Sequence, residues 1–223
     1  MIPHILFLAV MLSLPTAPAT TSAADRADQT VQKPDQSALV RARTEKLIDA
    51  FKRVKEVKKS ESSSASDQAA NAKSFAELDG FFARDHFVSV AIEPRRAKFS
   101  DAQLTGFRSL FWSVVQLVAY PGSGAFFREA KVEIAQPTQK GEVWTIDLKT
   151  YVPSEDLETV VGLQWKEDAG QLRIIDVLFD GDSLVRDYQN QFARIVDKDG
   201  AQALIDLLHK KKAELSASEA KAP

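Results

Sequence analysis

A change in the spacing of apolar residues near position 131 constrains the fold of this chain more than any other feature. Upstream of it, apolar residues recur every three or four positions, as on one face of a helix. Between 131 and 179 they alternate with polar residues, which is the pattern of strands with one buried face. Turn-forming residues divide this region into four strand segments, at 131–134, 144–152, 157–165 and 172–179. Because the connections are short and polar, consecutive strands should pair antiparallel.

The predicted fold class is therefore α+β, with a four-stranded antiparallel meander wrapped by N-terminal and C-terminal helices. One face of the meander is strongly apolar, and helices are the elements available to cover it. A first helix should begin near residue 36, and two short helices are expected between 75 and 92. After the last strand, one helix is expected from 184 and another after the turn 197–200.

The clearest helix signal is the capping box Ser100–Gln103. Behind it, Leu104, Phe107, Phe111 and Val114 recur at helical spacing. The stretch Pro121-Gly122-Ser123-Gly124 is expected to end this helix, because proline and glycine disfavour helix interiors.

The first 24 residues resemble a secretory signal peptide. The apolar run from Ile5 to Leu14 is too short to span a bilayer, and small residues follow it. We expect residues 1–24 to be cleaved, leaving a protein secreted across the inner membrane and not anchored to it. Residues 25–73 are predicted to hold the first helix and a Ser-rich stretch that is either a mobile linker or a weak, solvated helix. Residues 213–223 are predicted to be a disordered tail.

Composition excludes several classes of function. The formal net charge of −2 offers no general basicity for binding nucleic acid. The absence of cysteine excludes a cysteine nucleophile, a thiolate metal site and a lipid-modified N-terminal cysteine. We expect a monomer.

Four carboxylates in the stretch DVLFDGDSLVRDYQNQF raise the question of a metal site. An EF-hand loop that begins at Asp180 would need an oxygen ligand at position 5 and glutamate at position 12, where the chain has Leu184 and Gln191. A structural role is favoured instead. Gly181 permits a sharp turn, and Asp182 or Ser183 can cap the following helix. Asp176, which interrupts an apolar strand, is expected to be hydrogen-bonded or at an edge.

No catalytic residue, metal site or cofactor is predicted. Beyond the signal peptide the only histidines are His86 and His209, and no G-x-S-x-G motif accompanies them. The chain also lacks a G-x-G-x-x-G motif and a P-loop.

Large apolar side chains are abundant, with 13 phenylalanines and 3 tryptophans. They could fill a core completely, or sheet and helices could leave a cavity between them for an apolar ligand. Periodicity alone does not distinguish these alternatives.

The C-terminal third resembles the signature of the MlaC family, also called toluene-tolerance proteins. The similar positions are Asp176, Val177, Gly181, Ser183, Leu184, Val185, Tyr188, Gln191, Phe192, Gly200, Leu204 and Ile205. The segment FFARDHF and the helix with Gln103, Phe107 and Phe111 resemble upstream parts of the family more loosely. The resemblance extends over about residues 75 to 210, so it includes most of the predicted domain 74–212.

This resemblance implies a periplasmic lipid carrier. Such a protein moves phospholipid between the outer membrane and an inner-membrane ABC transporter complex, helps to maintain outer-membrane lipid asymmetry, and works with an outer-membrane lipoprotein partner. It also implies a lipid-binding domain over 74–212, with a diacyl phospholipid as the ligand and an apolar pocket for the acyl tails. The aspartate and glycine of the acidic stretch would be architectural.

The candidate lipid-binding residues are the apolar positions expected to face the space between sheet and helices. They are Phe107, Phe111, Val114, Ile146, Leu148, Leu163, Ile174, Val177, Val185, Tyr188 and Phe192. Each could equally be plain core. Two alternatives stay open: an adaptor domain with a filled core and no ligand, and a hydrolase or isomerase on a cone-like sheet, which a pocket lined by both Asp176 and His86 would favour.

Overall fold

The structure, a computed structural model, describes residues 36–55 and 65–220. The expected signal peptide and the residues 56–64 of the Ser-rich stretch lie outside the described residues. The helices are α1 (Gln36–Lys52), α2 (Ala65–Asp79), α3 (Arg84–Ile92), the short 3-10 helix η1 (Glu93–Lys98), α4 (Asp101–Glu129) and α5 (Leu184–Ala220). The strands are β1 (Lys131–Ile134), β2 (Thr138–Lys140), β3 (Val143–Val152), β4 (Leu157–Asp168), β5 (Gln171–Phe179) and β6 (Asp182–Ser183).

The sheet is open and antiparallel, in the order β1-β3-β4-β5-β6, and β2 also pairs with β3. Strands β1 and β2 lie along different stretches of β3, so together they act as one edge strand that is interrupted near Pro137. The predicted α+β fold with an antiparallel meander is confirmed. The segment 137–141 was expected to be only a turn, but 138–140 pairs with β3 because the chain returns to extended conformation directly after the proline.

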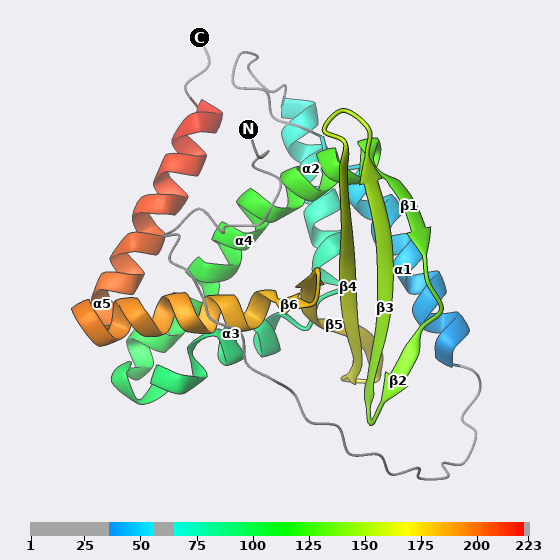
Figure 1. The fold of residues 1–223 in the computed structure, drawn as a ribbon. Coiled ribbons are helices and arrows are strands. Elements are labelled where there is room, and N and C mark those ends of the chain that lie inside the picture. Colours follow the sequence, from blue (N-terminus) through cyan, green and yellow to red (C-terminus); the bar gives the residue numbers. More distant parts are fainter. Residues whose placement is uncertain (1–35, 56–64, 221–223) are drawn as a thin grey trace.

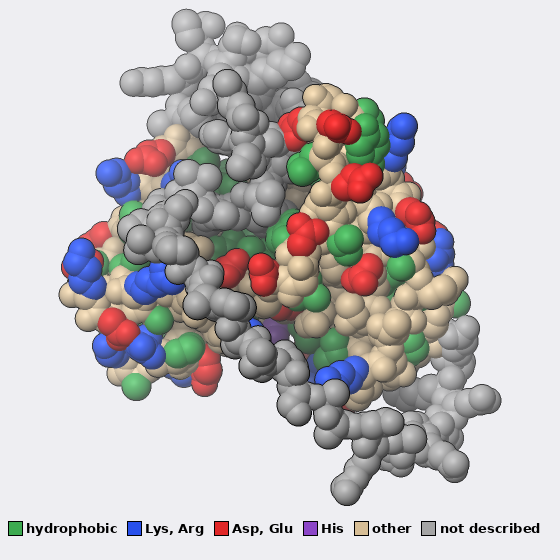
Figure 2. Space-filling model, viewed as in Figure 1, with side chains coloured by type: hydrophobic (Ala, Val, Ile, Leu, Met, Phe, Trp, Pro, Cys, Tyr) green, Lys and Arg blue, Asp and Glu red, His purple; other side chains and the backbone are tan. Residues whose placement is uncertain are grey.

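Helices cover one face of the sheet, and α4 runs through the middle of the helical layer (Figure 1). Helix α4 packs on α1, α3 and α5, whereas the sheet meets the helices mainly through α1, α3 and α5. The buried core lies between these layers and includes Phe107, Ile146, Trp165 and Ile174, each fully or almost fully buried. On the face seen in Figure 2, charges of both signs are interspersed and hydrophobic side chains form small separate spots.

Helix α4 is longer than predicted, because Pro121-Gly122-Ser123-Gly124 does not end it. Tyr120, Phe126 and Phe127 are buried on both sides of this stretch, and their packing outweighs the local cost of the proline. Gly124 serves close packing against α1, since a Cβ at this position would lie 2.8 Å from the carbonyl oxygen of Phe51.

By length and composition, α4 is also the one helix in the described ranges that could cross a membrane. More than half of its most apolar window, 56%, is buried inside the fold, as is usual for the core helix of a globular domain. We therefore treat α4 as a core helix.

Two further segments are more helical than expected. Of the two alternatives left open for the Ser-rich stretch, the helix is correct from Ala65 onwards, where α2 begins. Helix α5 continues to Ala220, past residue 212, where order was predicted to end. Good helix formers such as Ala, Glu, Lys and Leu fill this last part, and Leu215 packs against the core.

Candidate functional site

The acidic stretch between β5 and α5 is architectural. Asp176 accepts hydrogen bonds from the backbone N–H of Val177 at 2.8 Å and of Val185 at 3.2 Å, and from the hydroxyl of Ser183. The Ser183 hydroxyl in turn accepts the N–H of Arg186 at 3.1 Å, which confirms Ser183 as a helix cap. These contacts give acceptors to two backbone N–H groups in the first turn of α5, and they hold this turn against the end of β5.

Of the other carboxylates of this stretch, Asp180 bonds to β4, and Asp187 lies near the charges of Asp182 and Asp176. Asp180 accepts hydrogen bonds from Thr159 and from the N–H of Val160, so it holds the end of β5 against β4. Burial and the negative charges of Asp182 and Asp176 raise the pKa of Asp187. Within the described ranges, no group of three His, Asp or Glu side chains could hold a metal ion.

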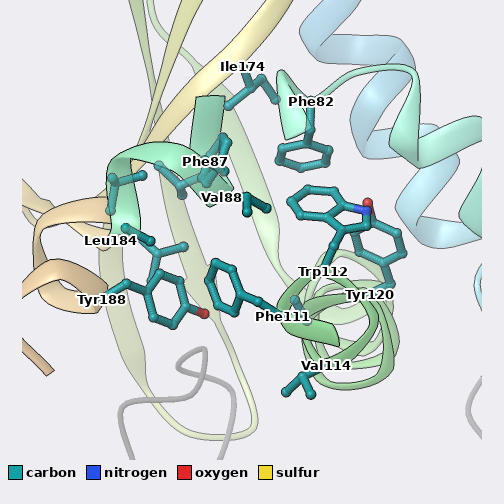
Figure 3. Close-up of a cluster of buried hydrophobic side chains, with 14 of the residues drawn as sticks. Phe82, Phe87, Val88, Phe111, Trp112, Val114, Tyr120, Ile174, Leu184 and Tyr188 are labelled. Carbon is teal, nitrogen blue, oxygen red and sulfur yellow. The ribbon is translucent and has the colours of Figure 1, made fainter. Parts of the chain in front are cut away.

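The candidate site is a small apolar cavity between the sheet and the helices. Nine side chains from the α2–α3 connection, α3, α4, β5 and α5 line it, and all are aliphatic or aromatic. They are Phe82, Phe87, Phe111, Trp112, Val115, Tyr120, Val177, Leu184 and Tyr188. Figure 3 shows most of these side chains converging from the different elements.

Aromatic rings form most of the cavity wall. Phe82 packs edge-on against Phe87 and Trp112, with centroid distances of 5.9 and 6.0 Å. On the opposite side, the rings of Phe111 and Tyr188 meet at 4.9 Å. Such edge-to-face pairs contribute about 0.5–1.5 kcal/mol each beyond the area that they bury.

The polar atoms of Trp112 and Tyr120 are bound by one carboxylate outside the cavity lining. Asp79, at the end of α2, accepts hydrogen bonds from Trp112 Nε1 at 3.0 Å, Gln116 Nε2 at 2.8 Å and Tyr120 Oη at 2.8 Å. Burial and the Asp79 charge raise the pKa of Tyr120, and burial raises the pKa of Tyr188. Both phenols therefore stay neutral, and the cavity presents an apolar surface.

The structure brings the eleven sequence-predicted residues into one core, but only three line the cavity. These are Phe111, Val177 and Tyr188. Phe107 and Phe192 form a further layer of rings behind Phe111, with centroid distances to it of 5.4 and 5.1 Å. The remaining six are buried around the cavity or on the inner face of the sheet: Val114, Ile146, Leu148, Leu163, Ile174 and Val185.

A β-bulge explains why residues three apart share the inner face of β5. Trp165 pairs with Ile174, and Gln164 pairs with Asp176, so β5 carries one extra residue, Ile175. The bulge places Ile174 and Val177 on the same side and leaves Asp176 free to cap α5.

Six of the lining residues were not predicted: Phe82, Phe87, Trp112, Val115, Tyr120 and Leu184. Trp112, Gln116 and Tyr120 lie at i, i+4 and i+8 on one face of α4, which is a signal that the sequence contains. It was obscured because Tyr120 immediately precedes the proline that was expected to end the helix.

The cavity is nearly closed. Its volume is about 20 Å³, which is room for about one water molecule. The hollow expected from the sequence, roomy enough for fatty chains, is therefore not open in this conformation, because the aromatic side chains themselves fill the space. A separate hollow that contains His86 is lined by Asp85, Asp168 and Arg173, among others, and not by Asp176.

Comparison with known proteins supports one family. The fold is similar to a phospholipid-binding protein from Ralstonia solanacearum, solved in complex with a phospholipid at 1.53 Å resolution. That match has a TM-score of 0.62 and 13% sequence identity, and it covers 82% of this chain and 99% of the other. No curated protein sequence matches this chain. The MlaC protein family matches residues 44–210, which is most of the chain, and on this basis the chain belongs to the MlaC family.

Proposed function

We propose that this protein is a periplasmic phospholipid carrier that encloses acyl chains between its sheet and its helices. The observation that carries the proposal is the apolar cavity, lined by nine aliphatic or aromatic side chains, in a chain of the MlaC family. The phospholipid-bound relative from Ralstonia solanacearum supports the same class of ligand. Family and neighbour together favour binding and transport over catalysis.

The chemistry of a carrier agrees with this interior. Exposing two acyl chains of roughly 16 carbons to water costs on the order of 20 kcal/mol, at about 0.8 kcal/mol per methylene. A carrier that crosses an aqueous compartment must therefore enclose the chains, and it needs no catalytic group. By the family's pattern, the lipid passes between the outer membrane with its lipoprotein partner and an inner-membrane ABC transporter complex.

Loading requires the helical layer to move away from the sheet. Helix α4 has its main contacts with other helices and few with the sheet, so it can shift without breaking strand pairing. The ring pairs Phe82–Tyr120 and Phe111–Tyr188 would then separate and turn to the chains, which offer equivalent apolar contacts.

The nearly filled interior supports a second candidate, a periplasmic adaptor domain that binds no lipid. One measurement distinguishes the two proposals: the amount of phospholipid that co-purifies with the protein. Mass spectrometry of an organic extract should find diacyl phospholipid at close to one molecule per chain if the carrier proposal is right. Protein that is free of lipid even after incubation with phospholipid vesicles would support the adaptor instead.

The substitution Val177→Asp tests the location of the lipid. Val177 lines the cavity and is 6% exposed, so an added carboxylate would face the acyl chains. We expect bound phospholipid to fall at least tenfold. Val160→Asp is the matched control, because Val160 is 37% exposed on the neighbouring strand β4 and should keep its lipid. Equal lipid content in both variants, with circular dichroism showing both folded, would exclude this cavity as the site.

A further inference from the structure

A second hollow, polar in character, lies beside the apolar cavity. It has a volume of about 380 Å³ and lies at the connection between α2 and α3. Its polar and charged lining comes from that connection and from the β4–β5 hairpin: Asp79, Arg84, Asp85, His86, Asp168 and Arg173.

The two hollows share one wall. Phe82 and Phe87 of the α2–α3 segment line the apolar cavity, and Arg84 to His86, between them in sequence, line the polar hollow. Asp79 lines the polar hollow and accepts hydrogen bonds from Trp112 and Tyr120, whose rings line the apolar cavity (Figure 3). A single layer of side chains therefore separates space suited to hydrocarbon from space suited to charge.

The polar hollow offers both signs of charge. Arg84 is close enough for its charge to lower the pKa of the Tyr120 hydroxyl, although burial and Asp79 raise that pKa more. The Nε–H of Arg173 is buried without a hydrogen-bond partner, and the nearest carboxylate oxygen, on Asp168, lies 3.7 Å away. A buried donor of this kind is unusual and favours an acceptor from outside the chain.

The polar hollow is also lined by exposed carboxylates and by a histidine. Asp85 and Asp168 are exposed carboxylates on the same hollow, within reach of solvent. Burial, together with the charge of Lys166, lowers the pKa of His86, so its imidazole is neutral near pH 7 and can donate or accept one hydrogen bond. Two guanidinium groups and three carboxylates thus face one space, and the third carboxylate, Asp79, already accepts hydrogen bonds from Trp112, Gln116 and Tyr120.

We propose that this polar hollow holds the headgroup of a zwitterionic phospholipid, with Arg84 and Arg173 binding the phosphate and Asp85 and Asp168 binding the ammonium. The inference rests on the carrier function and names the lipid class that the carrier prefers. Guanidinium groups pair well with phosphate oxygens, and carboxylates pair with an ammonium group. A headgroup without the ammonium would leave the two carboxylates beside the phosphate with no cation between them.

Headgroup selection during loading tests the proposal. The full-length mature protein, stripped of lipid, is incubated with vesicles of phosphatidylethanolamine and phosphatidylglycerol in equal amounts with identical acyl chains. Bound lipid is then identified by mass spectrometry. We expect a preference of about threefold to tenfold for phosphatidylethanolamine, as partly exposed ion pairs would contribute.

Substitutions test the carboxylates and the guanidinium groups of the hollow separately. The double variant Asp85→Asn with Asp168→Asn should bind the two lipids in the ratio of the vesicles while keeping its total lipid. Arg84→Gln should lower uptake of both lipids. Because Arg84 is exposed, this change should leave folding intact. Asp101→Asn and Arg108→Gln, at exposed positions of α4 away from the hollow, are the matched controls and should behave as wild type.

The outcomes distinguish this inference from the carrier function. Uptake of phospholipid with no preference, or a preference that survives the double substitution, would overturn the headgroup assignment and leave the carrier function standing. Displacement of bound lipid by millimolar inorganic phosphate would also overturn it, by showing a site for free anions. No uptake of any phospholipid would overturn both proposals.

Discussion

At the scale of single residues, Asp79 is the polar group that links α2 to the cavity wall. Its carboxylate receives three donors from successive turns of α4, on Trp112, Gln116 and Tyr120. Hydrogen bonds to a charged acceptor contribute about 1.5–3 kcal/mol each. Asp79 therefore ties the end of α2 to α4 and orients two of the rings that line the cavity.

The contribution of this cluster can be measured with conservative substitutions. Tyr120→Phe removes one donor and should lower the free energy of unfolding by about 1.5 kcal/mol, because two donors still satisfy Asp79. Asp79→Leu leaves three donors without their acceptor and should cost about 3 kcal/mol or more. Urea denaturation followed by circular dichroism gives both values.

Tyr151→Phe is the control for this prediction. The Tyr151 hydroxyl also donates to a carboxylate, on Asp156, but at the exposed surface, so its loss should cost less than about 0.5 kcal/mol. If Tyr120→Phe and Tyr151→Phe lower the free energy of unfolding by the same small amount, Asp79 does not hold the helical layer together.

At the scale of elements, α5 shows how one residue shapes a helix. Gly200 has φ 85° and ψ 168°, a conformation that is open to glycine and strained for other residues, and it divides α5 into two arms (Figure 1). Residues before the kink, such as Tyr188 and Phe192, pack in the core around the cavity, and Leu204 and Leu208 bury the second arm. The kink lets a single chain segment cover two sides of the core.

Replacing this glycine should be costly. Gly200→Ala forces a Cβ into the strained conformation and should lower the free energy of unfolding by about 1–3 kcal/mol. Gly106→Ala is the matched control. Gly106 lies inside α4, where a Cβ would meet no atom from other parts of the chain within 4 Å, so alanine should stabilise by about 0.4–1 kcal/mol. Thermal unfolding of the two variants should move in opposite directions, and a Gly200→Ala protein as stable as wild type would disprove the strain.

Most elements could be predicted from the sequence because their signals are local. The capping box at Ser100 forms as expected, with the Gln103 N–H donating to the Ser100 hydroxyl at 3.3 Å and the Gln103 side chain accepting the Ser100 N–H at 3.0 Å. The end of α4 was predicted wrongly because residues beyond the proline are buried by packing against parts of the chain that are distant in sequence. Phe127, for example, stacks on Phe51 of α1 at 5.6 Å.

At the scale of the whole molecule, the closed interior predicts how the protein behaves without ligand. A cavity of about 20 Å³ leaves the core packed, so the stripped protein should be a well-ordered native state. We expect it to unfold cooperatively in urea, to keep its near-ultraviolet circular dichroism and to bind little 8-anilinonaphthalene-1-sulfonate. Strong binding of this dye together with loss of the near-ultraviolet signal would mean that the layers depend on lipid to pack.

The sequence by itself determined the order of helices and strands, the antiparallel pairing and the structural role of the acidic stretch. These follow from periodicity, turn residues and caps, which act between neighbours in the chain. Only the tertiary structure decided which apolar side chains line the cavity, how little space they leave, and that a charged hollow lies behind the same wall. Those properties depend on how side chains from five separate elements fill a common volume, and hydrophobic spacing along one element carries no information about that volume.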